Sequence, residues 1–420
     1  MKRIKVVALR RLFFLLAIVP AAVQQAATQV TLSGAPHVFL LDAKHLKETR
    51  QRIRDGDKSF TPALTELERD ATRALAAGPF SVVNKNATPP SGDKHDYMSL
   101  APYWWPNPKT PDGLPYVRRD GERNPEIGRI PNHGDMGRMC EAVETLALAY
   151  YFTGDETYAA KAGQLLRAWF LDPPTRMNPN LQYGQAVPGI NTGRGIGLIE
   201  TSGLPQVVDA IGLLAGSKDW TETDQRGLEE WFAKFLQWML ESKNGRDEAA
   251  AKNNHGTYYD VQVASFALFL GKTELAADVL RAAGPKRIAA QIEPDGRQPL
   301  ELARTKSWGY STMNLRGLMS LATLGERVRV DLWNYQSADA RSIRKALDYL
   351  VPFTLDGQKW PHQQLGRLSP QALYPSLRLA ALRYPDGPYR TLALKIPPED
   401  PASRSRLLRP TLAEPKPVAK

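Results

Sequence analysis

Apolar residues recur at intervals of three and four along much of the chain from residue 136 onward. In the segment 136–152 they fall at Met139, Val143, Leu146 and Tyr150, the spacing that gathers apolar side chains on one face of an α-helix. The same spacing predicts further helices over 156–170, 221–241, 257–270, 273–283, 312–324, 338–350 and 370–383. Gly or Pro ends most of these segments. The alternating pattern typical of strands is scarce, so the sequence predicts an all-α fold.

Successive helical segments follow one another in pairs joined by short turns that contain glycine. This order predicts antiparallel hairpins that lie side by side, as a bundle, a solenoid or a closed α/α toroid. Strict sequence repeats are absent, which argues against a regular solenoid, and a toroid suits a single large domain with a central cleft. The Pro-rich stretch 87–133 has little periodicity, and a long loop of this kind is often a functional lid or rim.

The two ends of the chain differ in composition from the body between them. Five basic residues lie before the apolar run 12–19, and an Ala-rich stretch follows it, which is the order found in secretory signals. The apolar run is short for a membrane span. We therefore expect a signal peptide over 1–27, a helical domain over 28–396 and a disordered tail over 397–420. The protein is expected in the periplasm or outside the cell, with no membrane contact after signal removal.

The chain of 420 residues carries a net charge of +11, and subtracting the five basic residues of the predicted signal leaves +6 for the mature chain. A moderately basic exported protein favours a polyanionic partner. An acidic polysaccharide fits this compartment better than nucleic acid, since the sequence has no clustered run of Lys and Arg. The alternative is that the charge only aids solubility. A monomer is expected.

The sequence shows no motif for a metal site or a cysteine nucleophile. Cys140 is the single cysteine, and its place in a helical pattern favours a small buried hydrophobe over a nucleophile. Motifs such as H-E-x-x-H and the EF-hand loop are absent, so no metal or cofactor is expected. The segment GRGIGL at 193–198 is rich in glycine, but no predicted strand precedes it, so a phosphate-binding loop is not expected.

Aromatic residues gather in the Pro-rich stretch. The segment 97–126 contains YMSLAPYWWPNP followed by PDGLPYVRRDG. Aromatic faces stack on sugar rings, and guanidinium groups pair with carboxylates. The alternative is that the two tryptophans anchor the loop to the core. Adjacent residues of an extended chain point to opposite sides, so we expect one tryptophan to anchor and the other to bind. The predicted substrate-binding residues are Tyr97, Tyr103, Trp104, Trp105, Arg118 and Arg119.

Two polar segments lie next to predicted helices. KNNHGTYYD at 252–260 places Asn254 and His255 before a strongly apolar run, either as an N-cap and turn or as the edge of an active site. In the segment 292–315, Arg304 and Tyr310 are six residues apart and could face one cleft across a helix end. The alternative is a surface pair of Glu301 with Arg304 and a tyrosine in the core.

Taken together, these motifs resemble the alginate lyase superfamily of polysaccharide lyases. NNHG at 253–256, LELAR at 300–304 and the tyrosine six residues later occur in the order of that family, and PYWWPNP and PDGLPYVRRDG resemble its bacterial members. The similarity covers most of residues 90–320. It implies an incomplete α/α toroid in one large domain and an eliminative reaction on a polyuronate such as alginate, with polymannuronate favoured. It places Asn254, His255, Arg304 and Tyr310 at the catalytic positions.

Elimination on a uronic acid needs a base, an acid and groups that neutralise the carboxylate. The base removes the proton on C5, the C4–O4 bond breaks, and negative charge builds up on the carboxylate, where donors such as Arg304 and Asn254 would act. Tyr310 would protonate the leaving O4. Tyr310 could be both base and acid if H5 and O4 lie on the same side of the ring, as in mannuronate. His255 is expected as the base if they lie on opposite sides.

Two other functions fit the same sequence. α/α toroids also host glycoside hydrolases, which use two carboxylates, with Glu293, Asp295 or Asp93 as candidates. A periplasmic polyuronate-binding protein without catalysis is the second alternative.

Overall fold

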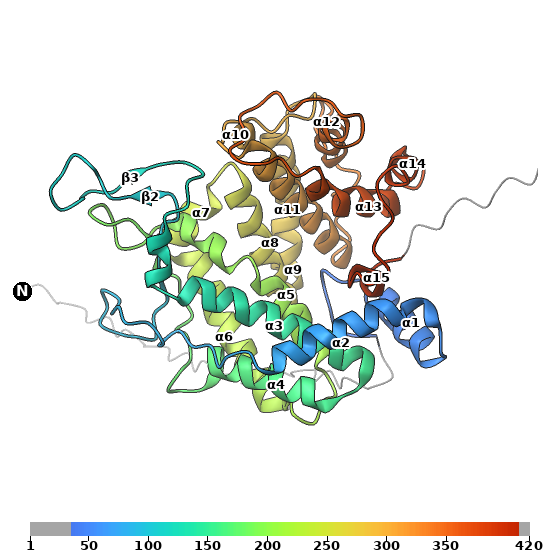
Figure 1. The fold of residues 1–420 in the computed structure, drawn as a ribbon, viewed down its shortest axis with the longest axis horizontal. Helices are drawn as coiled ribbons and strands as arrows, with labels where there is room; N and C mark the ends of the chain where they lie inside the picture. The colour runs from blue at the N-terminus through green and yellow to red at the C-terminus, as the bar shows by residue number, and fades with distance from the viewer. Residues whose placement is uncertain (1–34, 411–420) are drawn as a thin grey trace, which may run out of the picture.

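The structure, a computed structural model, describes residues 35–410. Helices dominate it, and the strands are short (Figure 1). The strands are β1 (Met98–Leu100), β2 (Trp104–Trp105), β3 (Val117–Arg118) and β4 (Tyr183–Ala186). The helices are α1 (Ala43–Arg54), α2 (Thr61–Leu75), α3 (Asn132–Thr153), α4 (Glu156–Leu166), α5 (Leu204–Leu213), α6 (Glu222–Glu241), α7 (Lys243–Ala249), α8 (Asn254–Phe269), α9 (Thr273–Ala283), α10 (Pro299–Leu302), α11 (Ser307–Arg327), α12 (Ile343–Leu355), α13 (Tyr374–Arg383), α14 (Tyr389–Ala393) and α15 (Ser405–Leu408).

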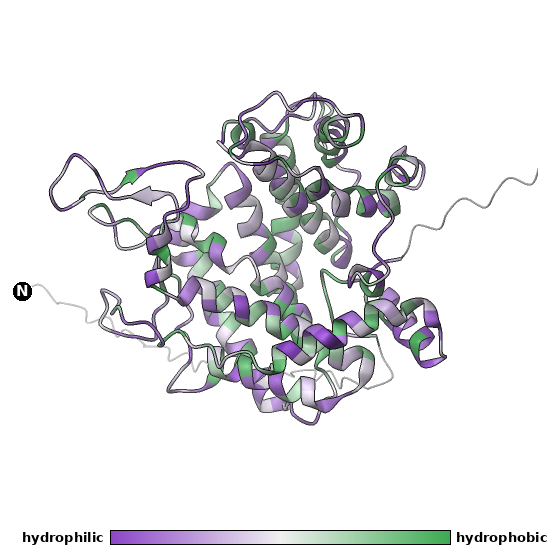
Figure 2. Cartoon of the chain, in the orientation of Figure 1, coloured by the Kyte–Doolittle hydropathy of each residue, from purple (hydrophilic) through white to green (hydrophobic). Residues whose placement is uncertain are grey.

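Consecutive contacts between helices build an arc of two layers. Helix α3 packs on α5, α5 on α8, α8 on α11 and α11 on α13, while α2 and α4 cover α3, and α6 and α9 cover α8. Nearly every side chain of α8 is buried, as expected for a helix enclosed by other helices. Outer helices such as α1 and α2 carry both hydrophilic and hydrophobic residues along their length (Figure 2). The predicted all-α single domain is confirmed, and this order of contacts is the one expected of an incomplete α/α toroid.

Local sequence signals explain where many helices begin and end. Thr221 and Asp224 form a reciprocal capping box at the start of α6, which satisfies two backbone groups at the helix end. Gly154 takes a left-handed conformation, with φ of 79°, just after α3, where a residue without Cβ is favoured. The predicted helices all overlap observed ones. The prediction missed α1, α2, α5 and α7 and the short helices α10, α14 and α15. The buried stripe of α2, for example, consists of only two alanines and one leucine.

The stretch 87–133 contains more structure than its sequence pattern predicts. Strand β1 pairs in parallel with β4, and β2 pairs with β3 in antiparallel fashion, with Trp104 opposite Arg118 and Trp105 opposite Val117. The β2–β3 hairpin projects from the helical body beside α7 (Figure 1). The hairpin therefore presents a tryptophan and an arginine side by side.

The C-terminal prediction was wrong for residues 397–410. Helix α15 lies in this stretch, Leu407 is fully buried, and Arg404 donates hydrogen bonds to Asp70 and Thr145. These contacts hold the segment against α2 and α3 in spite of its polar composition. Residues 411–420 and the predicted signal over 1–27 lie outside the described residues. Within residues 35–410, none of the helices has the length and apolar character needed to cross a bilayer.

Candidate active site

The segment KNNHG caps a helix and also lies at the edge of a polar site, so both interpretations of its sequence apply. Asn253 has an extended backbone, and its side chain accepts a hydrogen bond from the backbone N–H of His255. This cap starts α8 three residues before the predicted boundary. Asn254 and His255 therefore lie in the first turn of a helix that is otherwise buried in the core.

His255 is oriented by a buried carboxylate. Its Nδ1 lies 2.8 Å from Oε1 of Glu248, a residue of α7 that is fully buried. Among residues 35–410, the Nε2 atom on the other side of the ring has no hydrogen-bond partner. The His255 side chain is 16% exposed. In the tautomer whose Nδ1 proton is donated to Glu248, the Nε2 lone pair is available, as a general base needs.

Asn254 is bound to a second buried carboxylate. Its backbone N–H donates to Oε1 of Glu301 at 2.6 Å, and its side-chain Nδ2 lies 3.0 and 2.8 Å from Oε1 and Oε2. Burial of Glu301 raises the pKa of its carboxyl group. The interpretation of Glu301 as part of a surface pair was therefore wrong, since its exposed fraction is 1%. Helix α10 ends at Leu302, so Arg304 lies in the turn before α11.

Arg304 links the aromatic loop to Tyr310. Its Nε and Nη2 atoms donate to Asp120, and Nη2 also donates to the Tyr310 hydroxyl at 2.7 Å. The guanidinium carbon lies 3.8 Å from the centre of the Tyr310 ring. Burial acts to raise the pKa of Asp120, but hydrogen bonds from Arg304 and Thr305 outweigh it and hold that pKa well below its usual range. Asp120 is therefore ionised, and the charge of Arg304 already has a partner.

Tyr310 keeps its proton in this environment. Burial raises the pKa of its phenol, and the hydrogen bond that it donates to the Tyr103 hydroxyl, at 2.9 Å, raises the pKa further. Arg304 favours the phenolate, as the sequence suggested, but its effect on the pKa is the smaller one. At neutral pH the Tyr310 side chain is a phenol with a proton available to give.

The four predicted catalytic residues come together around Glu301. This carboxylate is hydrogen-bonded to Asn254 and interacts electrostatically with both Arg304 and His255. Arg304 in turn binds Tyr310. Segments that are about fifty residues apart in the sequence thus form one polar network at the N-terminal ends of α8 and α11.

The predicted substrate-binding residues separate into two groups. Tyr103 joins the network through Tyr310, while Tyr97 was predicted wrongly. Tyr97 is fully buried and donates to Oε2 of Glu200 at 2.7 Å, because it directly precedes β1, which pairs with β4 in the interior. It is a core residue and has no surface to offer a sugar ring.

The two tryptophans of the hairpin are both partly exposed. The Trp105 indole donates to the backbone oxygen of Glu122 at 2.9 Å and lies under the guanidinium of Arg119. Trp104 has no such indole bond, and Arg194 lies 5.8 Å from its ring centre. Trp105 is thus held to its own loop, and the expectation that one tryptophan anchors and the other binds stays a prediction.

Arg118 and Arg119 belong to the same hairpin. Arg118 donates to Asp120 at 2.8 Å, and Arg119 lies 4.0 Å from Glu122. Their side chains are 54% and 43% exposed. Both guanidinium groups are therefore accessible at the edge of the network, each with one carboxylate neighbour.

Four residues that shape the site were not predicted from the sequence, namely Asp120, Glu248, Gln185 and Arg194. Glu248 lies seven residues before His255 and forms no recognisable motif with it. Arg194 lies in the Gly-rich segment 193–198, which was considered only as a phosphate-binding loop. Asp120 follows the two arginines of the loop directly, which was the one available signal.

The three candidate carboxylates of the hydrolase alternative do not share one set of partners. Glu293 and Asp295 both pair with Arg297, and both have accessible side chains. Asp93 lies in another loop, where it accepts hydrogen bonds from His95 and Asn178. Within residues 35–410, no group of three or more His, Cys, Asp and Glu side chains is arranged to hold a metal ion.

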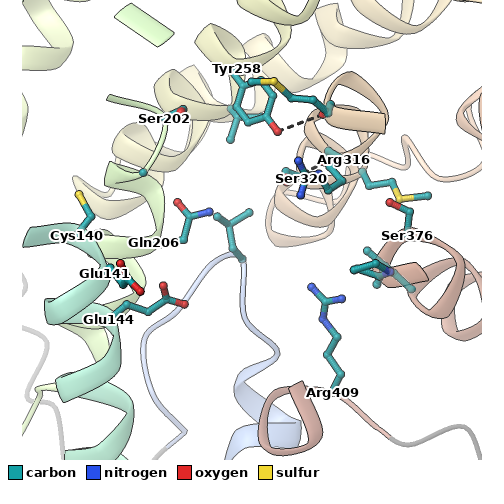
Figure 3. A pocket seen from close by; sticks show the side chains of 17 residues that line it. Cys140, Glu141, Glu144, Ser202, Gln206, Tyr258, Arg316, Ser320, Ser376 and Arg409 are labelled. Atoms are coloured by element: carbon teal, nitrogen blue, oxygen red, sulfur yellow. Dashed lines mark hydrogen bonds between the residues drawn. The ribbon is translucent and has the colours of Figure 1, made fainter. Parts of the chain in front are cut away.

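A cavity of about 550 Å³ lies among α3, α5, α8, α11 and α13 (Figure 3). Tyr258 and Met313 line it, one helical turn beyond His255 and Tyr310. Its wall includes Cys140, and burial raises the pKa of that thiol to about 12. This agrees with the interpretation of Cys140 as a small buried residue. The cavity shares no lining residue with the polar network described above.

Comparison with known proteins gives one family. Residues 81–360 match the family model described as alginate lyase. The sequence is 40% identical to that of an alginate lyase from Bacteroides ovatus whose crystal structure is known. The match covers 89% of this chain and 99% of that chain, with a TM-score of 0.85. No curated protein matches it significantly.

More distant structures share the fold. Alginate lyase A1-III from Sphingomonas species A1 is 16% identical over 90% of this chain and 95% of its own, with a TM-score of 0.55. A histidine-to-alanine variant of A1-III, in complex with a tetrasaccharide, is 14% identical over 93% of this chain and 98% of its own, with a TM-score of 0.58.

Proposed function

This chain is a polysaccharide lyase that belongs to the alginate lyase family, and we propose that it cuts alginate by β-elimination, with polymannuronate as the preferred polymer. The observation that carries the proposal is the pair of opposite proton states within one network. His255 is held by Glu248 with its Nε2 lone pair free, while Tyr310 retains its phenolic proton. A base and an acid are the two groups that elimination requires.

In the proposed reaction His255 removes the proton from C5 of the uronate. The electron pair of the C5–H bond forms the C4–C5 double bond as the C4–O4 bond breaks. Tyr310 gives its proton to the departing O4, and the hydrogen bond from Arg304 to the Tyr310 oxygen stabilises the phenolate that results. The new non-reducing end is a 4,5-unsaturated uronate. In mannuronate H5 and O4 lie on the same side of the ring, so the proposed reaction requires His255 and Tyr310 to act on the same face of the bound sugar.

The family comparisons support a polysaccharide partner. Histidine-to-alanine and tyrosine-to-phenylalanine variants of alginate lyase A1-III both hold a tetrasaccharide. Histidine and tyrosine are the residue types proposed here as base and acid. We also propose that the enzyme acts as a monomer in the periplasm or outside the cell, where the predicted signal peptide would send it.

The test is a polymer screen with the purified protein. Polymannuronate, polyguluronate and glucuronan are incubated separately, and the ultraviolet absorbance of the unsaturated ends is followed. We expect absorbance to rise with both alginate polymers, faster with polymannuronate. New reducing ends without absorbance would indicate a hydrolase, and unchanged chain length with measurable binding would indicate a binding protein.

A further inference from the structure

Most charged groups of the proposed active site already have a partner. Arg304 is paired with Asp120, and the Glu248 carboxylate is bound to the Nδ1 atom of His255. The Asn254 amide, expected from the sequence to reach the substrate carboxylate, is bound to Glu301. A polyuronate brings one carboxylate on every sugar, so the site needs a cation that is not yet neutralised.

Arg194 meets this description. Its Nε donates to the backbone oxygen of Gln185 at 3.1 Å, and its Nη2 donates to the Gln185 side-chain oxygen at 3.0 Å. Both acceptors are uncharged. Among residues 35–410, no carboxylate lies within ion-pair distance of the Arg194 guanidinium. Burial lowers its pKa to about 10, which still leaves it charged at neutral pH.

The backbone around Arg194 is built to hold it. Gln185, which accepts both hydrogen bonds, has a φ of 52°, a strained value for a residue with a side chain. A Cβ at Gly195 would lie 2.7 Å from the backbone oxygen of Asn244, and one at Gly197 would lie 2.6 Å from that of Gly184. The glycines of GRGIG therefore allow the segment to fit closely between β4 and α7. This gives the Gly-rich motif a structural purpose unrelated to phosphate binding.

The neighbours of Arg194 place it in the site. Its guanidinium lies by the ring of Trp104 and interacts electrostatically with Arg118, Glu200 and Glu248. Glu248 is the residue that orients His255, and Glu200 already accepts hydrogen bonds from the side chains of Tyr97 and Ser99. Arg194 therefore lies between the β2–β3 hairpin and the proposed base.

We propose that Arg194 binds a uronate carboxylate of the bound polymer and makes the site selective for charged over neutral polysaccharide. The proposal rests on the lyase function proposed above. Burying part of a cation without a counter-ion costs desolvation free energy. A substrate carboxylate would supply the counter-ion and accept charge-assisted hydrogen bonds from the guanidinium. Trp104, beside it, offers a face on which the same sugar could stack.

The experiment measures binding without turnover. His255→Ala is used as the background, and a mannuronate tetramer is titrated by calorimetry into this variant with and without Arg194→Gln. We expect the second substitution to weaken binding of the tetramer by roughly tenfold or more, the effect of losing a hydrogen bond to a charged group. Arg194→Lys, which keeps the charge but not the two-pronged geometry, should recover part of the affinity.

The methyl ester of the same tetramer distinguishes the loss of a carboxylate contact from a general disturbance of the binding site. Its carboxyl groups carry no charge, so Arg194→Gln should leave its affinity unchanged. Arg281→Gln is the matched control, because it removes the same charge from a surface pair on α9, and it should change neither affinity. Equal affinity for the acid with and without Arg194, or equal losses for acid and ester, would overturn the proposal.

The outcome is separable from that of the proposed function. Rising absorbance from the wild-type protein together with no effect of Arg194→Gln on acid binding would leave the lyase standing and remove Arg194. Weaker acid binding by Arg194→Gln without any cleavage by the wild-type protein would keep Arg194 as a carboxylate-binding residue and remove the lyase function.

Discussion

The two sides of the candidate site prepare their side chains in opposite ways. On the α7–α8 side, a fully buried carboxylate holds the Nδ1 atom of His255 and leaves Nε2 ready to take a proton. On the α11 side, burial and the neighbouring Tyr103 keep the proton on Tyr310. Pairs of titratable groups whose surroundings favour opposite proton states identify the base and the acid of a site. The predictions below alter one side at a time, from the largest expected effect to the smallest.

Removing the acid should have the largest effect. Tyr310→Phe takes away the proton donor and the oxygen that Arg304 binds, so kcat on polymannuronate should fall by about 10²–10⁴-fold. Tyr384→Phe is the control, because it removes a phenol whose hydrogen bond goes to the backbone of Trp333, and it should keep full activity. Unchanged turnover by Tyr310→Phe with a normal melting temperature would remove Tyr310 from the mechanism.

Disturbing the base indirectly should cost less. Glu248→Gln removes the charge that fixes the Nδ1 proton of His255, so the ring can populate the wrong tautomer, and kcat should fall by roughly 10²-fold. Glu241→Gln, at the exposed end of α6, gives the matched comparison. If Glu248→Gln changed only the melting temperature and left kcat alone, the carboxylate would be a structural group.

Changing Tyr103 should move the pH profile. The neutral phenol of Tyr310 donates to Tyr103, which stabilises the protonated form and raises the pKa of Tyr310. Tyr103→Phe removes this effect, so Tyr310 should lose its proton at lower pH, by about 0.7 pH unit for a hydrogen bond worth about 1 kcal/mol. The alkaline decline of kcat should therefore begin earlier than in the wild type. A shift to higher pH, or none, would contradict the assignment of Tyr310 as the acid.

Tyr97 provides the smallest effect and tests a corrected prediction. Tyr97→Phe loses a buried hydrogen bond to Glu200, so stability should fall by about 1–3 kcal/mol, seen as a lower melting temperature. KM for alginate should stay the same, since no part of the ring is exposed. A higher KM with unchanged stability would restore Tyr97 as a substrate-binding residue.

The sequence predicted α6 and α8, whose buried residues include large aromatic side chains, but it missed α5 although that helix buries Leu204, Val208 and Ile211. It missed α2, whose stripe is small, and α7, whose buried face includes Glu248. His255 and Tyr310 were found through short motifs in a fixed order. Glu248 and Arg194 were not, because a buried carboxylate and an unpaired guanidinium look like surface residues until their neighbours are known. Tyr97 shows the opposite error, in which an aromatic residue in a binding-type segment turned out to be core.

The central claim is that the C4–O4 bond is broken by elimination at His255 and Tyr310. The most direct test is to run the reaction on polymannuronate in water enriched with heavy oxygen and to weigh the products by mass spectrometry. Elimination adds no water, so the account predicts unsaturated ends that lack one water and contain no heavy oxygen. Incorporation of one heavy oxygen atom at each cut, in saturated products, would contradict it.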